Sequence, residues 1–251
     1  MPHFTGADGT SLYYDDQGEG TVVLLLHGFV GDVNIDWVRS GILDRLLDEG
    51  YRTVGYDARG HGLSDKPHDT EAYSGEVLAR DAMALLDALG VASCFVVGFS
   101  MGARTALHLA TLDERVQGVV ALGVGENSLR LAEGIPGGAS MSDVLLTDDP
   151  DAIEPAALRH YREMADAIRA DRVALAALMS APKPEIVDFV DQVSVPVLIV
   201  TGSEDVGAGS PDPLAARLAD AEAVTTAGDH AGVKDQYATQ QAIVEYLAKR
   251  A

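Results

Sequence analysis

The sequence predicts an α/β fold in which a mostly parallel central sheet is flanked by helices on both faces. Short runs rich in valine, leucine and isoleucine alternate along the chain with longer segments that repeat apolar residues at helical spacing. This alternation is typical of parallel strands joined by helical crossovers. A length of 251 residues and a hydrophobic content of 47% suit one globular core with room for a modest insertion.

The expected strands are mostly continuous apolar runs, as strands buried on both faces of a sheet require. They cover residues 22–26, 53–56, 95–97, 116–122, 195–201 and 223–226. A further run at 12–15 is predicted to be an antiparallel edge strand. The helical patterns between the strands cover residues 36–48, 76–89, 101–112, 213–218 and 236–248.

The alternation breaks once, between residues 126 and 191. This stretch lacks a clear core strand and contains helical patterns at 156–168 and 173–179. We therefore expect a small helical cap at 126–191, inserted after the sixth strand of a core formed by 1–125 and 192–251. Such a cap would exclude water from the site and shape its pocket. An ordinary irregular connection is the alternative interpretation.

Composition excludes several classes of partner and site. The formal charge of −21, from 39 acidic and 18 basic residues, would repel nucleic acid and anionic membranes. Neither a signal peptide nor a membrane-spanning run is recognisable, so we expect a cytoplasmic protein. The single cysteine, Cys94, excludes an internal disulfide and is expected to be a buried, inert thiol. The oligomeric state cannot be inferred from the sequence.

Ser100 is the candidate nucleophile. It is the centre of a Gly-x-Ser-x-Gly motif that directly follows the predicted strand at 95–97 and directly precedes the predicted helix at 101–112. A sharp strand-to-helix turn of this kind exposes the serine hydroxyl. Gly98 and Gly102 remove Cβ atoms that would otherwise clash with the neighbouring strand and helix. The motif alone is weak, and its context makes it specific.

A serine hydroxyl needs a base, and the base needs an orienting acid. His230 is the candidate base because it lies just after the last strand, at the same edge of the sheet as Ser100. Asp205 is the candidate acid because it follows the penultimate strand and lies between the serine and the histidine in the chain. Glu204 and Glu126 remain alternatives, and Asp229 is disfavoured because it adjoins His230.

The negative oxygen of a tetrahedral intermediate requires two backbone N–H donors. Met101, which follows the nucleophile, supplies one candidate. Phe29 supplies the other because Gly28 permits an unusual turn after the strand at 22–26. Both residues are also expected to line the substrate site. His27 is interpreted as a structural hydrogen-bonding residue, and a plain glycine turn is the alternative for this loop.

The order of these motifs resembles the α/β-hydrolase superfamily, in particular its small bacterial members with a lid. These include esterases, enol-lactonases and haloperoxidase-like perhydrolases. The resemblance covers nearly the whole chain apart from the cap and depends on His27-Gly28-Phe29, the stretch from Tyr56 to Asp65, Gly98 to Gly102, Gly202 to Asp205, and His230. It implies that Asp57, Arg59 and His61 hold a loop in place. A serine at 100 argues against the branches that resemble haloalkane dehalogenases and epoxide hydrolases, which use aspartate there.

The expected function is that of a serine hydrolase acting on a small carboxylic ester or lactone through an acyl-enzyme on Ser100. We expect no cofactor or metal, because the chemistry needs none and no His/Cys cluster has zinc-ligand spacing. Two alternatives stay open. One is a related reaction on the same triad, such as perhydrolysis, thioester cleavage or carbon–carbon hydrolysis. The other is a non-catalytic ligand-binding protein on the same scaffold.

Overall fold

A computed structural model describes residues 1–130, 140–154 and 158–250 and contains, within them, one eight-stranded sheet. The strand order is β1-β2-β4-β3-β5-β6-β7-β8, and the strands from β4 to β8 in this order are parallel. The predicted α/β class with a mostly parallel sheet is therefore confirmed. The strands are β1 (His3–Thr5), β2 (Ser11–Gln17), β3 (Val22–Leu26), β4 (Arg52–Tyr56), β5 (Cys94–Phe99), β6 (Val116–Leu122), β7 (Val197–Gly202) and β8 (Ala221–Thr226).

The prediction of the sheet edge was wrong in one respect. Strand β2 contains the expected run at 12–15 and is antiparallel to β4, but it is not the edge. The short strand β1 pairs with it on the outer side, with Phe4 opposite Leu12. Three residues are too few to produce a recognisable alternation, so β1 depends on its pairing rather than on a local pattern.

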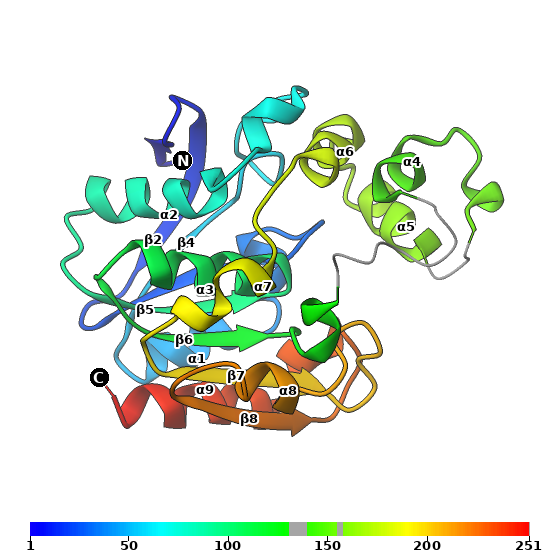
Figure 1. Cartoon of the computed structure of the whole chain (residues 1–251). Helices are drawn as coiled ribbons and strands as arrows, with labels where there is room; N and C mark the ends of the chain where they lie inside the picture. The colour runs from blue at the N-terminus through cyan, green and yellow to red at the C-terminus, as the bar shows by residue number, and fades with distance from the viewer. Residues whose placement is uncertain (131–139, 155–157, 251) are drawn as a thin grey trace.

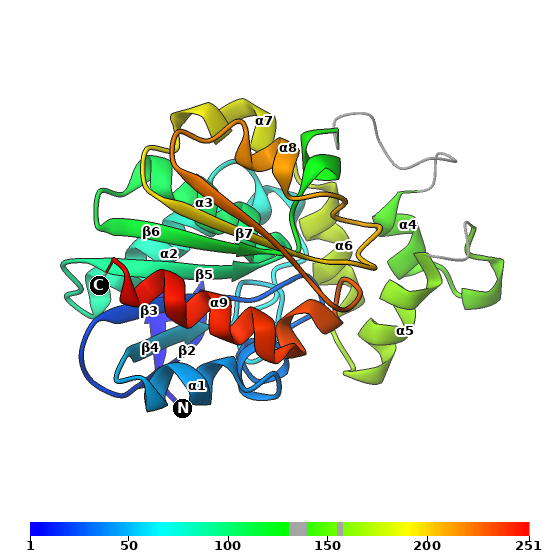
Figure 2. The same cartoon turned by 90° about the horizontal axis from the view of Figure 1, so that it is seen from below.

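The helices cover both faces of the sheet (Figures 1 and 2). On one face, α2 (Val77–Ala88) and α3 (Met101–Leu112) bury aliphatic side chains against the sheet, joined by α7 (Ile186–Phe189) and α8 (Asp212–Ala215). On the other face, α1 (Ile42–Asp48) and α9 (Tyr237–Ala248) form a second apolar cluster. The shorter helical turns are η2 (Thr70–Tyr73), η3 (Glu126–Leu129), η5 (Pro150–Ala152), η7 (Val190–Gln192) and η8 (Gly232–Asp235).

The helix predicted at 36–48 is broken into two pieces. A π-helical turn, η1 (Asn34–Val38), precedes α1, and Gly41 stands between them with φ 77°. The Ser40 hydroxyl donates to the Asp36 carbonyl at 2.7 Å, which satisfies the backbone where the helix stops. Within η1 the side chain of Asp36 is buried.

Three helices, α4 (Met141–Leu146), α5 (Arg159–Ala167) and α6 (Arg172–Ser180), lie beyond the carboxyl ends of the strands (Figure 1). They share a small apolar cluster of their own. Helices α5 and α6 correspond to the ranges predicted at 156–168 and 173–179, although residues 156 and 157 lie outside the described part. The division at 126–191 stays a prediction, and at its far end Ile186, Phe189 and Val190 pack into the core of the sheet.

Among the described residues, no helix has the length and apolarity that crossing a membrane requires.

Candidate active site

Ser100 lies at the turn between β5 and α3. Strand β5 ends at Phe99 and α3 begins at Met101, so the serine alone makes the turn. Its backbone has φ 53° and ψ −110°, outside the regions that L-residues ordinarily occupy. The Ser100 N–H donates to the Leu122 carbonyl at 2.8 Å, which ties the turn to the end of β6. The strand, the turn and the helix lie as the sequence predicts.

Two glycines allow the chain to pass closely around this turn. A Cβ atom at Gly102 would lie 1.9 Å from the Leu26 carbonyl oxygen, and one at Gly98 would lie 2.3 Å from the Gly102 carbonyl oxygen. Both distances are far below van der Waals contact, and both involve backbone atoms that cannot swing aside. The motif's glycines therefore serve the close packing of α3 against β3 and β5.

Three side chains from different loops form one hydrogen-bonded chain. His230 Nε2 lies 3.0 Å from Ser100 Oγ, and His230 Nδ1 lies 2.8 Å from Asp205 Oδ2. The residues follow β5, β7 and β8, and the carboxyl ends of these parallel strands meet at one edge of the sheet. In this geometry a carboxylate orients an imidazole, which can accept the serine proton.

The acid of this chain is deeply buried, and the base is partly open. The Asp205 side chain has no exposed surface, whereas that of His230 is 34% exposed. The second Asp205 oxygen, Oδ1, accepts the Ala208 N–H at 2.8 Å. With both oxygens occupied, the carboxylate presents Oδ2 to His230 in a fixed direction.

The alternative acids lie elsewhere. Glu126 accepts a weak hydrogen bond from the Ser210 N–H at 3.5 Å and pairs with Arg130. Asp229 accepts the Gly232 N–H at 2.8 Å, within its own loop. Glu204 is exposed. Asp205 is therefore the carboxylate that the fold places against His230.

The loop after β3 leaves one amide available beside the nucleophile. The N–H of Gly28 donates to Asp36 Oδ2 at 2.8 Å, that of Val30 to His61 Nε2 at 3.3 Å, and that of Gly31 to the Gly28 carbonyl at 3.1 Å. Within the described residues the Phe29 N–H has no such acceptor. Within these residues the Met101 N–H, in the first turn of α3, also has no acceptor. Both candidate oxyanion donors are thus free to bind a ligand atom.

His27 and His61 hold this loop against the loop after β4. His27 Nε2 accepts the Ala58 N–H at 2.9 Å, and its Nδ1 contacts the Gly28 carbonyl at 2.8 Å. Burial lowers the pKa of His61 to about 3, so this ring is neutral at physiological pH. A neutral ring can accept the Val30 N–H through Nε2, while Nδ1 faces the Arg59 carbonyl at 3.1 Å. Both histidines therefore form hydrogen bonds with the backbone of these loops, and His27 makes the structural hydrogen bonds expected of it.

Asp57 and Arg59 complete the same support. The carboxylate of Asp57 accepts the Val33 N–H at 2.9 Å and the Leu63 N–H at 2.8 Å. The fully buried Arg59 pairs with Asp81 at 2.7 Å and with Asp8 at 2.8 Å. The expectation that Asp57, Arg59 and His61 fix a loop is confirmed by these contacts.

The helices beyond the sheet contact the candidate oxyanion loop through apolar and aromatic side chains. Val30 has φ 61°, which is rare for a β-branched residue, and its side chain is buried in the cluster shared with α4, α5 and α6. The Phe29 ring lies 6.2 Å from the Tyr161 ring of α5. Burial and the nearby Asp205 carboxylate raise the pKa of the Tyr161 hydroxyl. Tyr161 therefore packs beside the candidate oxyanion loop.

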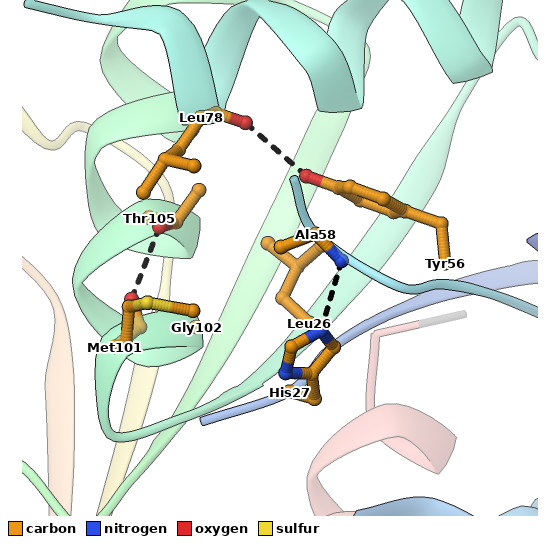
Figure 3. A pocket seen from close by; sticks show the side chains of 8 residues that line it. All are labelled: Leu26, His27, Tyr56, Ala58, Leu78, Met101, Gly102 and Thr105. Carbon is orange, nitrogen blue, oxygen red and sulfur yellow. Dashed lines mark hydrogen bonds between the residues drawn. The ribbon is translucent and has the colours of Figure 1, made fainter. Parts of the chain in front are cut away.

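Two small cavities are lined by Met101, the residue after the candidate nucleophile. The first, of about 10 Å3, has room for a single water molecule at most and is lined by residues of β3, β4, α2, α3 and the loops after β3 and β4 (Figure 3). The second, of about 60 Å3, shares Leu78, Met101 and Thr105 with the first and extends to Arg104 and Lys183. Neither cavity is lined by Ser100 or His230, so neither is the space in front of the Ser100 hydroxyl.

Sequence reasoning missed three residues around the triad. The Phe99 ring packs against the His230 ring with 5.2 Å between centroids. Lys234 Nζ lies 4.8 Å from the centroid of the Phe99 ring and 3.5 Å from Asp36 Oδ1. The only sequence signal was an acidic residue, Asp36, beside Trp37 on the apolar face of a predicted helix.

Residues 21–169, more than half of the chain, match the family model of the alpha/beta hydrolase fold. The chain belongs to this α/β-hydrolase family. The match includes the candidate oxyanion loop and Ser100, and it ends before the loops that carry Asp205 and His230.

Curated relatives of this α/β-hydrolase match over part of their length. An epoxide hydrolase of Caballeronia sordidicola is 35% identical over 128 residues, which are 49% of this chain and 38% of the relative. A putative non-heme chloroperoxidase of Synechocystis sp. is 36% identical over 107 residues, 41% of this chain and 37% of the relative. The aligned stretches thus span well under half of these relatives.

Solved structures match the whole fold. The enol-lactonase from Burkholderia xenovorans has 25% sequence identity and a TM-score of 0.73, covering 98% of this chain and 100% of that one. A thermophilic esterase from Thermogutta terrifontis has 25% identity and a TM-score of 0.73, covering 99% and 98%. These likenesses extend over the helices beyond the sheet as well as the core.

Proposed function

We propose that this α/β-hydrolase is a serine hydrolase that cleaves small carboxylic esters or lactones through an acyl-enzyme on Ser100. The observation that carries the proposal is the continuous hydrogen-bonded chain from Ser100 Oγ through His230 to Asp205. The strained backbone of Ser100 supports it, because such strain is characteristic of functional positions.

In the proposed first half-reaction, His230 Nε2 takes the proton from the Ser100 hydroxyl as Oγ attacks the carbonyl carbon. Asp205 keeps the remaining imidazole proton on Nδ1 and stabilises the imidazolium that forms. When the tetrahedral intermediate collapses, the bond to the leaving oxygen breaks. That oxygen takes the proton from Nε2 and departs as the alcohol.

In the second half-reaction, His230 takes a proton from water as the water oxygen attacks the acyl carbon. The acyl–oxygen bond to Ser100 then breaks, the proton returns to Oγ, and the carboxylic acid leaves. Each negative tetrahedral oxygen would accept hydrogen bonds from the N–H groups of Phe29 and Met101. Since Met101 opens a helix of twelve residues, the helix dipole favours the same charge.

Several features bear on the substrate class. A serine nucleophile gives an ester intermediate that water can hydrolyse at its carbonyl carbon, which suits acyl rather than alkyl transfer. The structurally similar enol-lactonase and esterase support lactone or ester substrates. We further propose that residues 126–191 act as a cap over this site, because Tyr161 on α5 contacts Phe29 beside the nucleophile.

The proposal is tested by labelling Ser100 with a fluorophosphonate, locating the adduct by mass spectrometry, and using Ser100→Ala as the unlabelled control. A panel of aryl esters and lactones with graded acyl length then identifies the substrate class. Wild-type protein that stays unlabelled would exclude the serine hydrolase and favour a ligand-binding role. Labelling with turnover of a β-diketone alone would favour carbon–carbon hydrolysis.

Perhydrolysis is a second candidate, favoured by the match to a putative non-heme chloroperoxidase. Hydrogen peroxide would replace water in the second half-reaction and release a peracid. The test is peracid formation from an ester and peroxide, compared with hydrolysis by the same enzyme preparation. Peracid formed faster than the acid would make this reaction the principal one.

A further inference from the structure

Asp36 and Lys234 form a buried ion pair next to the proposed active site. Lys234 Nζ lies 3.5 Å from Asp36 Oδ1, and the two side chains are only 9% and 4% exposed. Asp36 comes from η1 and Lys234 from η8, two turns that are far apart in the sequence. The pair joins the segment after β3 to the segment after β8.

Each member of the pair is bonded to a loop that carries part of the proposed machinery. Asp36 Oδ2 accepts the Gly28 N–H at 2.8 Å, directly before the candidate oxyanion donor Phe29. Lys234 Nζ donates to the Ala231 carbonyl at 2.9 Å, directly after the candidate base His230. One ion pair therefore connects the candidate oxyanion loop with the loop that carries His230.

The Phe99 ring provides a second connection between the same groups. It precedes Ser100, packs on the His230 ring at 5.2 Å, and receives the Lys234 ammonium at 4.8 Å from its centroid. A cation over an aromatic face is attracted by the ring's quadrupole. The ammonium thus contacts the carboxylate that holds the oxyanion loop and the ring that supports His230.

Stability alone does not account for this pair. Burying two charges carries a desolvation cost that their attraction need not recover, and an apolar pair of similar volume is often equally stable. The directions of the hydrogen bonds are what an apolar pair cannot supply. Hydrogen bonds with fixed directions are suited to holding two loops at a set distance from each other.

We propose that Asp36 and Lys234 are positioning residues that hold the Phe29 amide and the His230 ring in register around Ser100. This inference rests on the proposed function, since register matters only if these groups act together. Neither residue contacts a reacting atom. Misplacement of a reacting group by about 1 Å lowers a rate about 100-fold, so the expected loss is in kcat rather than in KM.

The test compares Asp36→Asn, Lys234→Met and the double variant. Each single variant leaves one buried charge unpaired and is expected to lose stability as well as rate. The double variant removes both charges, so its stability is expected to approach that of the wild type. Its kcat for an aryl ester, and its rate constant for fluorophosphonate labelling, are still expected to be about 10- to 100-fold lower.

The matched control is Asp113→Asn with Arg115→Met. These residues form an ion pair of 2.6 Å with side chains 4% and 20% exposed, near the start of β6 and so at the other end of the strands. The control is expected to change stability without changing kcat. A further variant, Lys234→Gln, keeps a donor for Asp36 and Ala231 and is expected to recover part of the rate if Lys234→Met folds poorly.

The outcomes separate the two proposals. A wild-type protein that fluorophosphonate does not label overturns the serine hydrolase and, with it, the role of the pair. If the wild type is labelled and the stable double variant reacts at the wild-type rate, the pair is only structural and the inference alone fails. A double variant that is stable and slow, with an unchanged KM, supports it.

Discussion

The backbone strain at Ser100 can be measured by comparing two substitutions. With φ 53° and ψ −110°, this residue adopts a conformation whose cost for a residue with a Cβ is about 1–3 kcal/mol. Ser100→Ala and Ser100→Gly both delete the hydrogen bond to His230, so that loss cancels between them. Glycine relieves the strain but loses about 0.5–1 kcal/mol more conformational entropy than alanine on folding.

The difference leaves the Ser100→Gly variant more stable than Ser100→Ala by up to about 2.5 kcal/mol. For a chain of this size, that corresponds to a Tm higher by up to about 10 °C. Urea and thermal unfolding of both variants measure the difference. Ser74 is the control, because at φ −79° its glycine variant is expected to be less stable than its alanine variant. An alanine variant at 100 that is more stable than the glycine variant would refute the strain.

Three further outcomes are expected. Asp205→Asn replaces the acceptor of the His230 Nδ1 proton with an amide that favours the wrong tautomer, so kcat for an aryl ester falls by about 10^3- to 10^4-fold with little change in KM. Arg169→Gly removes a side chain at φ 55° after α5, where the Arg169 and Ala170 amides close the helix end. The free energy of unfolding should rise by about 1 kcal/mol with kcat unchanged, and a lower free energy of unfolding would mean that the arginine makes compensating contacts. His61→Gln tests the burial that lowers the pKa of His61 to about 3. The unfolded histidine binds a proton below about pH 6.5 and the folded one does not, so wild-type stability falls with pH by up to about 1.4 kcal/mol per unit between these values. The variant should show a shallower slope between about pH 6.5 and 4.5 in denaturant titrations, and an unchanged slope would contradict the assignment.

The strands and the candidate triad could be predicted because each leaves a local mark. Strands β3 and β6 begin and end at the predicted residues, since a strand buried on both faces is a continuous apolar run. The carboxyl ends of parallel strands meet at one edge, so residues that follow β5, β7 and β8 were expected to meet. Chemistry restricted the types of residue, and topology brought them together.

The supporting pair could not be predicted in this way. Asp36 lies in a segment whose apolar spacing suggests one continuous helix, and an acidic residue on such a face does not identify its partner. Lys234 lies in a polar loop, where a lysine ordinarily remains in solvent. Their ion pair joins η1 to η8, which are far apart in the sequence, and no local pattern in either segment specifies the partner.

The substrate is harder to infer than the mechanism for a related physical reason. Acyl transfer needs a hydroxyl, an imidazole and a carboxylate at fixed positions, so substituting any of them is chemically visible in the sequence. The side chains around the candidate oxyanion loop, Phe29 and Tyr161 among them, are mostly apolar, and apolar contacts are non-directional and tolerate exchange at similar volume. Val30 illustrates the consequence. Its side chain anchors the helices beyond the sheet from a backbone conformation that valine rarely adopts. The packing of these helices against the loop after β3 therefore depends on a local strain and a tertiary contact, neither of which apolar periodicity can report.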